Sequence, residues 1–379
     1  MDSVDRTGQD PRPSARLAAV RAWLDAHDQV DGLLLVRQES LEDYDLRYLT
    51  GFTGSSAFAI VSARRALLLT DVRYVEQAAQ QCPGWCIRRH GRPVAPALVE
   101  ALQGAGVRRL AFEPAGLTVA LWSELRDGLP DTALEPAAGA VTSQRACKDA
   151  AEVASIARAC TVSDAAFGQL LPELRAGARE RDVARRLEDL LYRNGADAIA
   201  FESVVASGPN SALPHARPGP RAFAPGDLIV FDFGARIDGY CADLTRTVVL
   251  GPAAAAQRRL YETVREIQAA AVAAVRAGAR CADLDAAAKR AMQDAGYGEY
   301  PTHSLGHGVG LAIHEGPALR PGNDALLVPG EVVTVEPGIY LPGFGGVRIE
   351  DTVVVEERGC RVLTGTPREL LELPVAEDA

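Results

Sequence analysis

The sequence predicts a two-domain protein, with an α/β layer domain over residues 1–145 and a larger α+β domain over residues 146–379. The length of 379 residues exceeds the roughly 250–300 at which a single hydrophobic core stops growing. Segments of the first domain alternate between helical and strand-like apolar patterns. The second domain repeats part of its own sequence at a fixed offset. These three observations together favour two architectures joined in one chain.

The first domain is expected to alternate short helices with short buried strands. Its apolar residues recur at helical spacing in some segments and run continuously in others, and the continuous runs suit buried strands. In order, we expect a helix at 17–24, strands at 32–36, 57–61 and 66–69, a helix at 95–102, a strand at 109–112, a helix at 117–125 and a loose stretch at 134–142.

The second domain contains an internal repeat. The segment Arg-Ala-Gly-Ala-Arg at 175–179 recurs at 276–280, an offset of 101, and the helices that follow keep that offset. Five matched letters could arise by chance, but the parallel order of helix, glycine break, helix and hairpin favours a duplication. The hairpins are expected at 228–233 with 241–250, and at 332–340 with 347–355.

Composition excludes several classes of protein. A net charge of −10 argues against a nucleic-acid partner, and the one basic cluster, residues 88–92, is expected to be a solvated loop. Seven scattered cysteines without a Cys-x-x-Cys pair suggest reduced thiols. The start of the chain is acidic and polar, and no apolar run approaches a membrane span, so we expect a cytoplasmic protein without a membrane partner.

Carboxylates interrupt the apolar strands of both predicted hairpins. Asp232 and Asp243 lie on the first hairpin, and Glu336 and Glu350 on the second. Across neighbouring strands such residues can face one another within roughly 5–8 Å. A buried carboxylate without a counter-charge costs several kcal/mol, and one arginine does not neutralise four carboxylates. Two divalent cations would carry enough positive charge to neutralise the four carboxylates.

Histidines gather in the same half of the chain. Of six in the sequence, four lie there: His215, His303, His307 and His314. A lone histidine is more often a core residue, and Asp232, Asp243, Glu336 or Glu350 taken singly could belong to a turn or a strand edge. Three histidines within twelve glycine-rich residues favour a site instead.

The joint pattern resembles the five-ligand signature of the pita-bread metallopeptidases, which include methionine aminopeptidase, aminopeptidase P and prolidase. The matching positions are Asp232, Asp243, His307, Glu336 in Thr-Val-Glu-Pro-Gly, and Glu350 in Arg-Ile-Glu-Asp. The segments at 47–55 and 70–74 resemble the N-terminal domain of Xaa-Pro aminopeptidases and dipeptidases. The resemblance implies an α/β creatinase-like N-terminal domain, followed by an α+β pita-bread catalytic domain with an internal pseudo-twofold repeat.

The resemblance also implies roles for individual residues. Asp232, Asp243, His307, Glu336 and Glu350 would hold two divalent metal ions, and the oxygen-rich set favours Mn²⁺ while tolerating Co²⁺ or Zn²⁺. A metal-bridged hydroxide would attack the scissile carbonyl, Glu336 would move the proton, and His215 or His314 would stabilise the oxyanion. His303, Tyr340 and Arg348, together with His215 and His314, would line the substrate pocket.

The expected function is removal of the N-terminal residue from small peptides with proline in second position, by an Xaa-Pro aminopeptidase. An Xaa-Pro dipeptidase (prolidase) is the alternative, because it shares the metal site and the reaction. A metal-free amidinohydrolase of the creatinase type, or a binding module that has lost catalysis, fits less well with an intact ligand set. The family further implies a homodimer.

Overall fold

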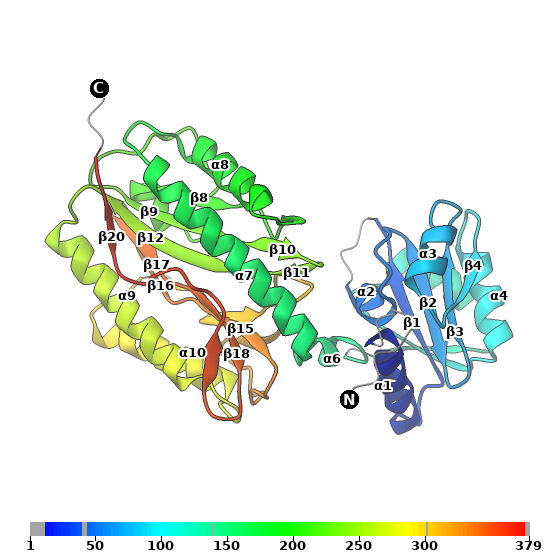
Figure 1. Ribbon diagram of the computed structural model, residues 1–379. Coiled ribbons are helices and arrows are strands. Elements are labelled where there is room, and N and C mark those ends of the chain that lie inside the picture. The colour runs from blue at the N-terminus through cyan, green and yellow to red at the C-terminus, as the bar shows by residue number, and fades with distance from the viewer. Residues whose placement is uncertain (1–11, 40–43, 138, 301, 376–379) are drawn as a thin grey trace, which may run out of the picture. The chain divides into compact units, whose positions relative to one another are not determined.

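The computed structural model describes residues 12–39, 44–137, 139–300 and 302–375. The chain divides into two compact units, Met1–Arg145 and Ala146–Ala379, which Figure 1 shows in blue to cyan and in green to red. Within the described ranges, no helix has the length and apolar character needed to span a membrane.

A mixed six-stranded sheet forms the centre of the first unit, in the order β4-β3-β2-β1-β5-β6. Strand β1 pairs antiparallel to β2 and parallel to β5, and its continuous apolar run at residues 33–36 suits a strand covered on both faces. The core joins the sheet to helices α4 and α5. The elements are α1 (Arg12–Ala26), β1 (Gly32–Arg37), α2 (Asp45–Thr50), β2 (Ala57–Ser62), β3 (Ala66–Thr70), α3 (Val75–Gln81), β4 (Cys86–Arg89), α4 (Ala95–Ala105), β5 (Arg109–Phe112), α5 (Val119–Gly128), β6 (Ala133–Pro136) and α6 (Thr142–Ala146).

Two expectations for this unit were wrong at its edges. Only part of the stretch at 134–142 is loose, because β6 extends the sheet parallel to β5 up to Pro136 and α6 begins at Thr142, while the described residues 137 and 139–141 lie in neither. Arg88 and Arg89 are exposed as expected, but they belong to edge strand β4 and not to a loop. Both edge strands are only four residues long and largely exposed, so they lack the apolar run that reveals a central strand.

The second unit repeats one helical arrangement. Helices α7 (Ala150–Leu170) and α8 (Glu180–Arg193) form the first pair, and α9 (Ala255–Ala274) and α10 (Cys281–Asp294) the second. Asp149 caps α7 in a capping box with Glu152, which satisfies free N–H groups at the helix start. In Figure 1 these helices lie in front of the strands of their unit.

The strands of this unit form several small sheets. In the four-stranded sheet, β20-β12-β9-β8, the strands β12, β9 and β8 come from the first repeat, and β20 follows the second repeat in the chain. The second repeat contributes a five-stranded sheet, β14-β13-β15-β18-β19. The elements are η1 (Leu171–Glu173), β7 (Ala198–Ile199), β8 (Val204–Ser207), η2 (Gly208–Ala212), β9 (Leu228–Phe233), β10 (Ala235–Ile237), β11 (Tyr240–Cys241), β12 (Leu244–Leu250), β13 (Gly306–Gly308), β14 (Glu315–Leu319), β15 (Val332–Val335), β16 (Gly338–Leu341), β17 (Gly345–Arg348), β18 (Asp351–Val355), β19 (Cys360–Val362) and β20 (Leu371–Leu373).

Both hairpins are interrupted where the sequence suggested continuous strands. In the first, Asp243 lies in the gap between β11 and β12. In the second, Glu336 separates β15 from β16, and Glu350 separates β17 from β18. The register of Val335 with Asp351 continues across the gap to Gly338 with Arg348, which places the two glutamates at facing positions. A strand-period pattern cannot reveal such a break, because the apolar alternation continues through it.

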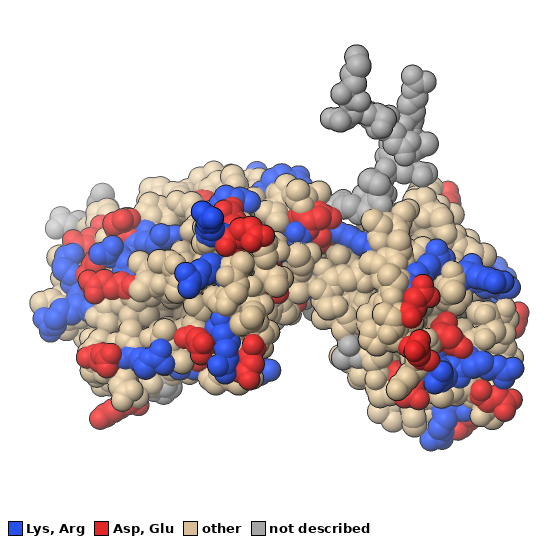
Figure 2. All heavy atoms as spheres, turned by 90° about the horizontal axis from the view of Figure 1, so that it is seen from below, with Lys and Arg blue, Asp and Glu red and all other residues tan. Residues whose placement is uncertain are grey.

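Charged side chains of both signs are mixed on the one face of the molecule drawn in Figure 2. On the face drawn in Figure 2, Lys and Arg are interspersed with Asp and Glu, and neither sign dominates. None of the seven cysteines, all of which lie in the described ranges, forms a disulfide.

Candidate metal centre

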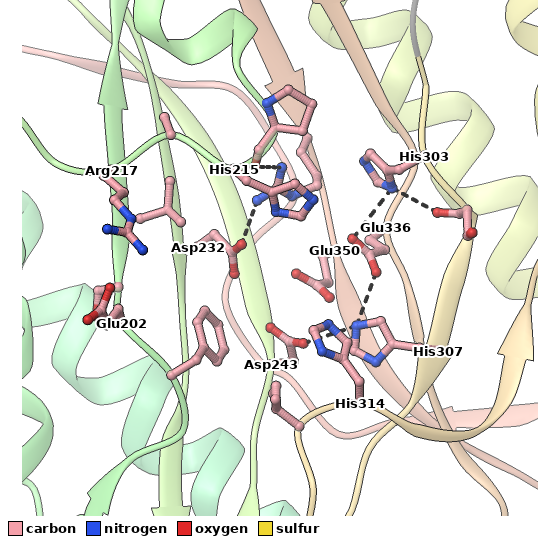
Figure 3. Close-up of a pocket in the computed structure, with 18 of the residues that line it drawn as sticks. Glu202, His215, Arg217, Asp232, Asp243, His303, His307, His314, Glu336 and Glu350 are labelled. Atoms are coloured by element: carbon pink, nitrogen blue, oxygen red, sulfur yellow. Dashed lines mark hydrogen bonds and ion pairs between the residues drawn. The ribbon is translucent and has the colours of Figure 1, made fainter. Parts of the chain in front are cut away.

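A cavity of about 510 Å³ opens in the second unit and collects nearly all the predicted site residues. Figure 3 shows their side chains converging from strands of both repeats. Nine of the ten predicted residues line it: His215, Asp232, Asp243, His303, His307, His314, Glu336, Arg348 and Glu350. The tenth, Tyr340, lies directly behind the wall.

Local backbone geometry brings the acidic residues and His307 together. Asp232 lies near the end of β9, whereas Asp243, Glu336 and Glu350 occupy the strand gaps. His307 is the middle residue of the short strand β13, between two glycines. A Cβ at Gly308 would stand 2.3 Å from the carbonyl oxygen of Gly316, so only glycine permits this close approach of β14.

Three side chains form a compact group suited to a metal. One ligand atom each from Asp243, His307 and Glu350 can be chosen so that all lie within 4.8 Å of one another. Nε2 of His307 is also 3.3 Å from Oε1 of Glu336 and 3.5 Å from Oδ2 of Asp243. Carboxylate oxygens and an imidazole nitrogen at these separations can converge on a divalent cation.

Hydrogen bonds orient these ligand atoms. Nδ1 of His307 is 3.1 Å from the carbonyl oxygen of Gly308, so it carries the proton and leaves Nε2 free. The hydroxyl of Thr245 donates to Glu350 at 2.6 Å, and that of Thr334 donates to Glu336 at 3.2 Å. The sequence analysis missed both threonines. The sequence did contain a signal for them, which is their spacing. Thr245 lies two residues after Asp243 and Thr334 two residues before Glu336, and residues two apart in a strand point to the same face.

The two carboxylate oxygens of Asp232 differ in their hydrogen bonding. Its Oδ2 accepts a hydrogen bond from Arg348 at 2.6 Å. Its Oδ1 is buried and has no hydrogen-bond partner within the described part of the chain. A buried anionic oxygen without a partner is costly, and a cation in the cavity would satisfy it.

The protonation preferences of the carboxyl groups point to the same requirement. Burial, followed by the charge of Glu350, raises the pKa of Asp243 well above its usual range, and burial and Glu336 do the same to Glu350. Burial raises the pKa of Glu336 to about 8 against the opposing charge of Arg348. These three groups resist ionising together in a protein without a counter-charge. The donor set therefore fits divalent metal ions, which would supply that charge.

Three of the cavity histidines, His303, His307 and His314, favour the neutral form. Burial lowers the pKa of His307 to about 3, with the neighbouring His314 adding to the effect. Burial also lowers the pKa of His303 to about 4 and lowers that of His314. His314 packs edge-on against His307, with the ring centroids 4.2 Å apart. Neutral imidazoles at working pH can ligate a cation or donate one N–H to an oxyanion.

The remaining wall is partly apolar, and sequence reasoning did not find it. Phe201, Val204 and Ile313 line the cavity together with Glu202 and Arg217, which Figure 3 shows at a distance from the carboxylates. Arg217 has no ion pair among the described residues, unlike Arg348, which binds Asp232. These residues carry no motif, and only the folded chain brings them to one wall.

The fold and this site together define a metallopeptidase. Residues 154–357 match metallopeptidase family M24, and residues 16–147 match the creatinase/prolidase N-terminal domain. The chain belongs to the M24 family. Its two-domain fold, a creatinase-like domain followed by a pita-bread catalytic domain, is confirmed.

Individual relatives carry proline-specific names. The chain is 45% identical to the Xaa-Pro dipeptidase of Pyrococcus furiosus over 60% of its own length and 65% of that protein. It is similar in structure to the Xaa-Pro dipeptidase from Bacillus anthracis, with a TM-score of 0.90, 37% identity and coverage of 95% of this chain and 100% of that one. It is also similar to the X-Pro aminopeptidase from Thermotoga maritima, with a TM-score of 0.86, 35% identity and coverage of 94% and 100%.

Proposed function

We propose that this chain is an Xaa-Pro dipeptidase that hydrolyses the bond between a first residue and a C-terminal proline. The observation that carries the proposal is the convergence of Asp232, Asp243, His307, Glu336 and Glu350 on one cavity. The sequence analysis expected an aminopeptidase first and a dipeptidase as the alternative. The names of the relatives favour the dipeptidase.

Two divalent ions, Mn²⁺ being our first choice for an oxygen-rich set, would supply Lewis-acid chemistry to water and to the scissile carbonyl. Asp232, Asp243, His307, Glu336 and Glu350 would hold them. Glu336 is the candidate proton carrier, since its carboxylate lines the cavity and its Oε1 accepts a hydrogen bond from Thr334 at 3.2 Å, which orients it beside His307. The proline nitrogen of the substrate has no N–H before cleavage and must gain a proton as it leaves.

Two histidines of the cavity wall are candidates for stabilising the charge that develops during the reaction. His314 or His215 would donate an N–H to the oxyanion that develops on the scissile carbonyl. His303, Tyr340 and Arg348 would form the proline pocket, because the ring offers no hydrogen-bond donor and has to be recognised by shape. Arg217 is a cation on the cavity wall that could meet the free carboxylate of a dipeptide.

The aminopeptidase remains the second candidate, supported by the likeness to the Thermotoga maritima enzyme. Metal-stripped protein should be assayed on Ala-Pro, Ala-Pro-Ala and Ala-Ala, with and without added Mn²⁺. Manganese-dependent cleavage confined to Ala-Pro would support the dipeptidase, and cleavage of Ala-Pro-Ala would support the aminopeptidase. Failure on both proline peptides with metal bound would overturn both. The homodimer and the cytoplasmic location stay predictions.

A further inference from the structure

We propose that Lys148 is a positioning residue for His314, acting through a buried ion pair with Glu315. Glu315 begins strand β14 and directly follows the connecting loop 309–314, which we name the His314 loop. The inference depends on the proposed function in one respect only, namely that His314 takes part in catalysis. The geometry that carries it is the set of contacts that Glu315 makes with Lys148 and with the backbone of this loop.

The ion pair is almost completely shielded from water. Nζ of Lys148 lies 2.9 Å from Oε1 of Glu315, and the two side chains are 1% and 4% exposed. Nζ also donates to the carbonyl oxygen of Ala146 at 3.0 Å, and the backbone N–H of Lys148 donates to Gly330 at 2.9 Å. The ammonium is therefore held in one place, and the carboxylate of Glu315 has to come to it.

The same carboxylate supports the backbone of the His314 loop. Its Oε2 accepts the N–H of Ala312 at 3.2 Å. A Cβ at Gly310 would stand 2.2 Å from Oε1, so the carboxylate lies directly against the Gly310 backbone. Gly310 in turn donates its N–H to the carbonyl oxygen of Ala312 at 3.0 Å. Glu315 thus holds a turn that precedes His314.

That turn also reaches the metal ligands. The carbonyl oxygen of Gly310 accepts the N–H of Cys241 at 2.8 Å, two residues before Asp243. His314 itself packs against His307. A shift of the loop would consequently displace the imidazole of His314 first, whereas Asp243 is also held by Thr352, whose hydroxyl donates to its backbone carbonyl oxygen at 2.8 Å.

Stability alone does not account for the pair. A buried salt bridge is often no more stabilising than well-packed apolar residues of the same size, because desolvation offsets the attraction. The His314 loop, however, has three glycines around it, at 308, 310 and 316, and no helix or regular ladder of its own. A carboxylate fixed by Lys148 gives such a loop one defined position, which a precisely placed donor needs.

The test is a double-mutant cycle between Lys148→Met and His314→Ala, measured as kcat and KM on Ala-Pro with metal content determined in parallel. We expect Lys148→Met to lower kcat by about 100-fold in the wild-type background, the size expected for a misplaced group. We expect little further loss in the His314→Ala background, with metal content unchanged. Multiplicative losses would overturn the proposal, because a residue that acts only through the fold lowers activity whether or not His314 is present.

Further variants keep the result interpretable. Lys148→Arg retains the positive charge and should recover most of the wild-type kcat. The side chain of Glu315→Gln can still accept the N–H of Ala312, so the kcat of that variant should lie between those of Lys148→Met and Lys148→Arg. Arg221→Met breaks a matched ion pair of the same unit, Arg221 with Asp227, that does not line the cavity, and kcat should remain near wild type. Amide exchange at Ala312 should be faster in Lys148→Met than in wild type. That readout needs no activity, so it separates failure of the ion-pair proposal from failure of the proposed function.

Discussion

The hydroxyl of Tyr340 lies 2.8 Å from Nε2 of His303 and 2.8 Å from Nη1 of Arg348. Nδ1 of His303 donates to the carbonyl oxygen of Ser304 at 2.8 Å, so its Nε2 accepts the Tyr340 proton. The same hydroxyl oxygen accepts from Arg348, whose other terminal nitrogen binds Asp232. One oxygen atom behind the cavity wall therefore connects the proposed proline pocket to a proposed metal ligand.

Tyr340→Phe removes that oxygen while keeping the ring. His303 and Arg348 then each lose a buried partner, and we expect kcat/KM on Ala-Pro to fall about 10-fold, in line with a loss of about 1–3 kcal/mol for unsatisfied buried groups. Tyr261→Phe is the control, because the hydroxyl of this buried tyrosine donates to the backbone carbonyl oxygen of Arg368 and does not line the cavity. Equal kinetic losses in both variants would contradict the proposed role of Tyr340.

Glu350→Gln should separate stability from metal binding. In metal-free protein the substitution removes one buried charge from a group of carboxylates that repel one another, and the amide oxygen can still accept from Thr245. We expect the free energy of unfolding of the metal-free variant at pH 8 to exceed that of metal-free wild type by about 1 kcal/mol or more. Metal titration should show weakened binding and the assay a loss of activity. A metal-free variant less stable than wild type would contradict this account.

The stability of the metal-free protein should fall as pH rises from 6.5 to 8. A carboxyl group whose folded pKa is raised binds its proton more tightly in the folded state, so its contribution is lost as pH rises through that pKa. Glu336, with a pKa near 8, titrates in this window. The depressed pKa values of His303 and His307 act in the opposite direction, but only below their usual value of 6.5.

This pH dependence is measured by chemical denaturation of chelator-treated protein at several pH values. Metal-loaded protein should not show the decline, because the cation replaces the proton as the counter-charge. Glu336→Gln should reduce it in the metal-free state. A metal-free protein whose stability is flat or increasing between pH 6.5 and 8 would contradict the prediction.

Gly308→Ala should be strongly destabilising because of the short approach to Gly316. The added methyl group must push β14 away from β13, and His307 lies beside it, so both unfolding free energy and metal affinity should decrease. Gly168→Ala is the control in helix α7, where a Cβ meets nothing within 4 Å and is expected to stabilise by about 1 kcal/mol. Thermal unfolding and metal titration of both variants test the contrast.

Sequence pattern predicted the alternation of the first unit, the repeat of the second and the carboxylates and histidines that meet in the cavity, whereas Arg348 and Tyr340 were expected only from the family resemblance. It did so because acidic residues within apolar strands need a physical reason to be there, as Asp232 and Glu336 illustrate. It could not predict the ion pair of Lys148 with Glu315, since 167 residues separate them and neither carries a motif. The resemblance assigned Arg348 only to the substrate wall, whereas the structure places its guanidinium on Asp232.

The proposed ligands are divided between the two repeats, with Asp232 and Asp243 in the first and His307, Glu336 and Glu350 in the second. Neither repeat alone can assemble the complete set. Binding of a divalent ion would therefore favour molecules in which both halves have folded and docked, over intermediates with only one half in place. Metal supplied during refolding should consequently act as a ligand for the finished molecule and increase the yield of complete folding, even in a variant that no longer turns over substrate.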